Sequence, residues 1–173
     1  MSATMIERPA SLSTRWALDR DETSVEFAVK TFWGLATVHG RFDRFDGSYE
    51  VGPDGVKKIE LTIDADSVDT GNSTRDDHLG SEDFFDIAGH PRLQFESTRV
   101  HDVGDGLLHV VGDLEAAGRV VQLEFPAEVR SVDRGIELEA TTSVDPARLG
   151  MSSGPLGMIR RPAMLHVKAR LSE

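Results

Sequence analysis

The C-terminal stretch LHVKARLS, Leu165–Ser172, places an apolar side chain at every second position. Alternate residues of a β-strand lie on the same face, so this period predicts a strand with one buried face and one solvated face. A parallel sheet covered by helices would show continuous apolar runs instead, so the pattern favours an antiparallel, all-β fold. The same alternation recurs in five other segments: Val25–Val29, Ile59–Ile63, Leu93–Phe95, Val121–Phe125 and Ile136–Ala140.

Turn sequences that contain glycine separate these segments. Glycine adopts positive φ at little cost, so each of them suits a tight hairpin turn. With the weaker segments Trp16–Asp19, Arg41–Val51 and Leu107–Leu114, we predict eight or nine strands. Such strands form either a sandwich or a closed barrel, and a barrel of eight is either filled by side chains or holds one small ligand. The turn sequences are Asp46-Gly47, Gly52-Pro53-Asp54-Gly55, Gly104-Asp105-Gly106 and Asp133-Arg134-Gly135.

Length and charge limit the function classes. The 173 residues suit one domain, which we place at 15–173 after a flexible Ser/Thr-rich leader at 1–14. The absence of cysteine excludes disulfides and thiolate chemistry. A net charge of −11 argues against nucleic-acid backbones and anionic membrane surfaces as partners. Neither a secretory signal nor a membrane-spanning run is visible, so we expect a cytoplasmic protein.

The stretch SVDTGNSTRDDHLGSEDFFD, Ser67–Asp86, departs from the strand pattern and predicts a helix. Asn72 or Ser73 can cap its N-terminus, and the pair Asp76-Asp77 then falls in the first turn, where the helix dipole favours negative charge. Gly80 weakens the pattern, so we expect a short or broken helix. We interpret this acidic stretch as a capped helical lid, not as a catalytic centre.

Charged residues near this helix have two readings. Arg75 and His78 could contact a polar or phosphate head group, or they could serve structure by bonding to a carboxylate and to backbone. The second break in the pattern, Gly150–Pro162, predicts a long loop, and its pair Arg160-Arg161 could add selectivity for a head group.

Catalysis and metal binding have weak support in the sequence. Most carboxylates occupy the solvated positions of the strands, whereas a catalytic carboxylate should be desolvated to shift its pKa. The six histidines form no H-E-x-x-H or i,i+4 pair, so we expect no metal. Ser152 and Ser153 do not lie in a nucleophile elbow.

Short motifs from Trp16 onward form a recognisable set: Trp16-Ala-Leu-Asp19, Ser24–Lys30, Gly40-Arg-Phe42, Phe45-Asp-Gly47, Asp69-Thr-Gly71, Arg75–Leu79, Asp83-Phe-Phe-Asp86, Pro91-x-x-x-Phe95-x-Ser97 and Gly112-Asp-Leu114. With these motifs the chain resembles the YceI-like family of bacterial proteins, from Trp16 to the C-terminus. The resemblance implies an eight-stranded antiparallel lipocalin-like barrel with one short helix near the mouth. It also implies a hydrophobic lumen that holds a long isoprenoid chain, such as a polyprenyl phosphate or a quinone. Thr31 departs from the family pattern, which has His at this position.

Periodicity alone favours an interior filled by the aromatic side chains, whereas the resemblance favours a hollow one. On the resemblance, we expect a non-enzymatic protein that binds an isoprenoid or fatty amphiphile for transport, storage or sequestration under stress, without another cofactor. There are two alternatives. One is an enzyme that acts on an apolar substrate in the same cavity, and the other is a filled barrel that acts through protein contacts, such as those of a homodimer. The expected ligand-binding residues are Phe27, Val29, Phe32, Trp33, Phe42, Leu61, Arg75, His78, Phe84, Phe85, Phe95, Leu123, Phe125 and Leu138.

Overall fold

The computed structural model describes residues 12–31, 36–151 and 162–173. These described residues are mostly in strands, with one α-helix among them, α1 (Ser73–Leu79), and short 3₁₀ helices at Ala65–Ser67 and Pro146–Leu149. The strands are β1 (Thr14–Thr31), β2 (Ala36–Phe42), β3 (Phe45–Val51), β4 (Lys57–Asp64), β5 (Val68–Asp69), β6 (Arg92–Gly104), β7 (Leu107–Ala116), β8 (Arg119–Val132), β9 (Gly135–Val144) and β10 (Ala163–Ser172).

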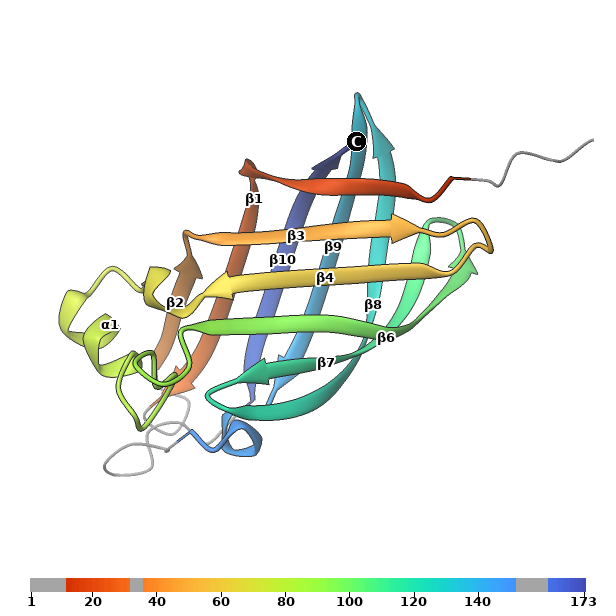
Figure 1. Cartoon of the computed structure of the whole chain (residues 1–173). Helices are drawn as coiled ribbons and strands as arrows, with labels where there is room; N and C mark the ends of the chain where they lie inside the picture. The colour runs from red at the N-terminus through yellow and green to blue at the C-terminus, as the bar shows by residue number, and fades with distance from the viewer. Residues whose placement is uncertain (1–11, 32–35, 152–161) are drawn as a thin grey trace, which may run out of the picture.

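Eight of these strands close into an antiparallel barrel, in the order β1-β3-β4-β6-β7-β8-β9-β10 and back to β1 (Figure 1). The long strand β1 makes the closure, because Thr14–Ala17 pair with β3, whereas the pairing with β10 runs from Ala17 to Ala28, with an irregularity between Asp19 and Ser24. The short strands β2 and β5 extend the sheet from β1 outside the closed ring. The predicted eight-stranded barrel is therefore confirmed over the sandwich.

The alternation of β10 has its predicted consequence in space. Ala169 and Leu171 are buried inside the barrel, and Leu165 and Val167 pack on the same interior from the same face. Met164 and Lys168 lie on the outer face and are exposed. Register with β9 and β1 holds this face inward, because a shift by one residue would turn every apolar side chain outward.

Three of the four predicted turns connect hairpins, but the prediction at Asp46-Gly47 was wrong, because both residues lie within β3. Glycine serves close packing there: a Cβ on Gly47 would lie 2.7 Å from the backbone oxygen of Glu60 on the neighbouring strand. A turn that the prediction missed joins β7 to β8 at Ala117-Gly118, where both residues have positive φ, 51° and 76°.

The predicted short helix is confirmed as α1, and Asn72 is its N-cap. The Asn72 side-chain oxygen accepts a hydrogen bond from the Arg75 backbone N–H at 3.0 Å. The helix ends at Leu79, before Gly80. The predicted leader lies mainly outside the described residues, and Thr14 already belongs to β1. Most of the predicted loop Gly150–Pro162 also lies outside them.

The connections between strands gather at the two ends of the barrel. One end, which we term the helical end, carries α1, the 3₁₀ helix Pro146–Leu149 and the Ala117-Gly118 turn (Figure 1). The other, the hairpin end, carries the β3–β4, β6–β7 and β8–β9 turns. The barrel interior between them contains the functional site.

Candidate functional site: a hollow apolar barrel

The barrel interior is hollow. The space that the centres of water molecules could occupy inside it measures about 190 Å³. One water molecule needs only about 10–15 Å³ on this measure, so the void exceeds a packing defect by an order of magnitude. The filled interior that periodicity alone favoured is therefore wrong.

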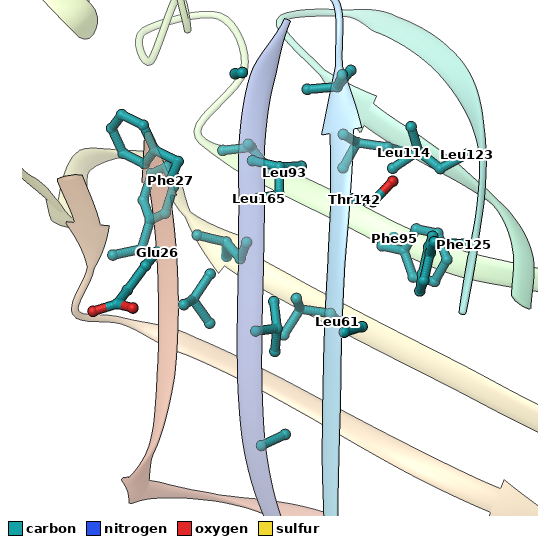
Figure 2. A pocket seen from close by; sticks show the side chains of 18 of the residues that line it. Glu26, Phe27, Leu61, Leu93, Phe95, Leu114, Leu123, Phe125, Thr142 and Leu165 are labelled. Carbon is teal, nitrogen blue, oxygen red and sulfur yellow. The ribbon is translucent and has the colours of Figure 1, made fainter. Parts of the chain in front are cut away.

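Side chains from all eight barrel strands line this cavity, and nearly all of them are apolar. Leucines and phenylalanines from opposite walls face one another across it (Figure 2). Several inward-facing residues, among them Leu61, Phe95 and Leu165, remain only partly buried although they point into the barrel. Their accessible surface faces the cavity, which leaves apolar area that a ligand can cover.

The cavity runs along the barrel instead of occupying one end. The buried side chains form two hydrophobic clusters, and the lining draws from both. Val167, Phe95 and Phe125 pack against both clusters and join them. At the helical end the cavity is bordered by Leu79 of α1 and by Leu149 of the 3₁₀ helix. This elongated form suits a chain-like ligand better than a compact one.

Phenylalanine rings make up much of the wall at the helical end. Phe42 packs against Phe27 and Phe85, with ring centroids 5.5 and 5.8 Å away. The Phe27 ring lies over Gly40, its partner on β2, where a Cβ would come within 2.3 Å of the ring. Glycine at position 40 therefore makes the room that this ring needs.

The polar groups along the lining are few, and their charges face outward. Glu60 pairs with Lys58 at 2.7 Å, and this hydrogen bond lowers the pKa of the Glu60 carboxyl. The Glu26 carboxylate points away from the apolar lining (Figure 2) and lies 3.7 Å from Nδ1 of His166. Burial, with a smaller effect of Asp102, raises the pKa of the Tyr49 hydroxyl, which therefore stays protonated at neutral pH.

The cavity is arranged to bury hydrocarbon. Among the described residues, no group of three or more His, Asp or Glu side chains is placed to hold a metal ion. A desolvated Asp or His inside the lumen would have indicated an enzyme, but the only carboxylates in the described lining are the two that face outward. The chemistry that this arrangement supports is the transfer of apolar surface out of water.

The structure brings together, around the cavity, all the aliphatic and phenylalanine residues that were predicted to bind the ligand and that lie within its described part. Phe32 and Trp33 lie outside the described residues. Arg75 and His78 are not part of the lining. The residues that line the cavity as predicted are Phe27, Val29, Phe42, Leu61, Phe84, Phe85, Phe95, Leu123, Phe125 and Leu138.

Arg75 braces the segment before α1. Its Nε donates to Thr70 Oγ1 at 2.8 Å, and one of its terminal nitrogens donates to the Thr70 carbonyl oxygen at 2.7 Å. Asp76 accepts from both the backbone N–H and the hydroxyl of Thr70, at 2.9 and 2.6 Å. His78 is exposed and lies against Phe84, with ring centroids 5.2 Å apart. The two residues thus support the segment that places Leu79 and Phe84 beside the cavity.

We expect Thr70→Val to loosen α1 without unfolding the barrel. The variant keeps the side-chain shape but removes the hydroxyl that joins Arg75 to Asp76. The hydroxyl makes two hydrogen bonds, and each costs up to about 1 kcal/mol when lost, so amides of α1 should exchange with solvent about five- to thirtyfold faster. Hydrogen-exchange mass spectrometry measures this. Thr74→Val, at an exposed position of the same helix, is the control; equal exchange in both variants would contradict the bracing role.

Sequence reasoning missed part of the lining. Leu93, Leu165 and Val167 line the cavity and stand in the apolar phase of the alternating segments, so the same signal could have identified them. Leu149 and Met151 also line it but belong to no alternating segment. Only the path of the chain after β9 brings these two residues to the barrel.

A closed eight-stranded antiparallel barrel around a hollow apolar interior defines the lipocalin-like class. Within it, the chain belongs to the YceI-like family, because it matches the YceI-like domain over residues 16–171. No helix among the described residues has the length and hydropathy needed to cross a bilayer.

Relatives of known sequence are UPF0312 proteins. The chain is 40% identical over 97 residues to a UPF0312 protein from Shewanella denitrificans, and the match covers 55% of this chain and 50% of that protein. It is 32% identical over 142 residues to a UPF0312 protein from Pseudomonas paraeruginosa, and this match covers 76% of this chain and 73% of that protein. The matched part thus spans about half the length of the Shewanella relative.

Solved structures share the fold at low identity. Burkholderia cenocepacia BcnA superimposes with a TM-score of 0.80 at 17% identity, covering 90% of this chain and 99% of that one. A structure described as a polyisoprenoid binding domain from Saccharophagus degradans gives a TM-score of 0.74 at 16% identity, covering 91% and 97%. At these identities the likeness establishes the architecture alone.

Proposed function

We propose that this protein binds a long-chain lipid of isoprenoid type inside the barrel and carries, stores or sequesters it without altering it. The observation that carries the proposal is the elongated cavity, whose wall is apolar along its length. The structural neighbour described as a polyisoprenoid binding domain supports the same ligand class.

Burial of hydrocarbon supplies the binding free energy. Each buried CH₂ contributes about 0.8 kcal/mol, so a five-carbon isoprene unit contributes about 3–4 kcal/mol before the cost of association. A few units therefore bind tightly without a hydrogen bond. Phenylalanine and leucine walls suit the branched, partly flat isoprenoid chain, because both present irregular apolar surface.

Organic extraction of the purified protein, followed by mass spectrometry, tests the proposal. We expect an isoprenoid lipid in a near-stoichiometric amount, and delipidated protein should take up an added isoprenoid again. Failure of both extraction and reloading would contradict the proposal and favour a barrel that acts through protein contacts. Conversion of the added lipid into a product would contradict simple carriage and favour an enzyme.

A further inference from the structure

One hydroxyl faces the cavity from the wall of β9. Leu138, Ala140, Thr142 and Val144 are inward positions of this strand, and all four line the cavity. The Thr142 hydroxyl points toward the space bordered by Leu114 and Phe95 (Figure 2). Val144 ends the strand at the helical end, so Thr142 lies one inward position deeper in the barrel.

Among the described residues, Thr142 Oγ1 has no hydrogen-bond partner. The neighbouring strands explain this. On one side Thr142 pairs with Leu165, whose side chain is apolar. On the other side the ladder between β8 and β9 ends at the Ala127–Ala140 pair, so Thr142 has no paired residue on β8. Thr98, outside the cavity lining, is different, because its Oγ1 donates to the Val111 carbonyl oxygen at 3.2 Å.

The other polar side chains of the described lining are less accessible to a ligand. Ser48 Oγ contacts Glu60 at 3.5 Å on the outer side of the wall. Tyr49 is only 5% exposed, and its ring stacks on Trp16 toward the hairpin end, with ring centroids 5.5 Å apart. Thr142 is half-buried, so its hydroxyl is the most accessible one in the described wall for a ligand's polar atom. A hydroxyl covered by a pure hydrocarbon would lose its hydrogen bonds to water and gain none.

We propose that Thr142 Oγ1 hydrogen-bonds an uncharged oxygen of the bound lipid, a hydroxyl or a carbonyl, held inside the barrel. This inference rests on the proposed function. The oxygen must be uncharged, because the described lining contains no Lys, Arg or His, and an unpaired charge in an apolar cavity is costly. A phosphate head group would have to stay outside the apolar lumen and would not reach Thr142.

The variant Thr142→Val tests this, because it replaces the hydroxyl by a methyl group of similar size. Delipidated protein is titrated with four probes that share the geranylgeranyl chain: the alcohol, the naphthoquinone, the monophosphate and the hydrocarbon. We expect affinity for the alcohol or the quinone to fall about three- to tenfold, and affinity for the phosphate and the hydrocarbon to stay within about twofold. Loss for the alcohol alone identifies a hydroxyl ligand, and loss for the quinone alone a carbonyl.

The control is Thr141→Val, which makes the same change at the exposed neighbouring position and should leave all four affinities unchanged. Unchanged affinity of Thr142→Val for both oxygen-bearing probes would overturn the inference. Equal weakening for all four probes would also overturn it, because that result indicates a change of shape. Failure of the unmodified protein to bind any probe would instead contradict the proposed function.

Discussion

We expect Ala140→Phe to weaken lipid binding strongly while the barrel stays folded. Ala140 lines the cavity and pairs with Val167, which packs against both hydrophobic clusters, so the new ring enters where the two clusters meet. It displaces several methylene groups of the ligand, each worth about 0.8 kcal/mol, so the retained lipid should fall by more than about tenfold. Because the ring enters empty space, it avoids most of the cost of about 1–3 kcal/mol for overpacking a filled core.

Mass spectrometry of extracted lipid, together with thermal unfolding, measures both parts of this result. Thr141→Phe adds the same ring to the exposed face of β9 and should keep the lipid. If a folded Ala140→Phe protein holds as much lipid as the unmodified protein, then the ligand does not occupy this cavity.

Gly112→Ala destabilises the barrel by about 1–3 kcal/mol, because the added methyl group has no room. A Cβ at Gly112 would lie 2.5 Å from Cζ of Phe95 and 2.6 Å from the backbone oxygen of Glu96. The backbone oxygen cannot move away without breaking the pairing of β6 with β7. The Phe95 ring would have to shift from its contact with Phe125, so lipid binding should weaken as well.

Urea unfolding measures the loss of stability. Gly52→Ala is the matched control, because there a Cβ would meet the side-chain oxygen of Asp54 at 2.8 Å, and an exposed side chain can turn aside. Equal stability of the two variants would show that the β6–β7 contact accommodates a methyl group and that Gly112 is not required by packing.

Alternation predicted which residues of the strands face inward, because the period of two depends only on neighbouring residues. It therefore identified the wall residues Leu61, Phe95 and Leu123 before any tertiary contact was known. It could not place Leu149, which reaches the barrel through a 3₁₀ helix with no strand period. The prediction of a turn at Asp46-Gly47 was wrong for a related reason. Glycine allows either a positive φ or a close approach of two strands, and the sequence alone does not distinguish these two roles.

Arg75 shows the same limit for polar residues. Its place beside two aspartates in an acidic stretch was compatible with a head-group contact, yet in the fold its guanidinium is bound to Thr70. Thr142 shows a different limit. The alternation of Leu138 and Ala140 extends to Thr142 and places it on the inward face, but spacing does not tell whether its hydroxyl meets a partner there. The pairing with Leu165 and the end of the β8–β9 ladder decide that.

The residue order thus specified antiparallel strands, their inward faces, a short capped helix and an acidic outer surface, since each of these follows from local spacing and charge. It did not specify whether the inward side chains meet. That depends on the closure of β1 onto β10 and on the distance between opposite walls, to which residues far apart in the chain contribute. A barrel of eight strands is near the size at which side chains just fill the interior. The number of strands therefore does not decide between a filled and a hollow interior, and the three-dimensional packing of the side chains does.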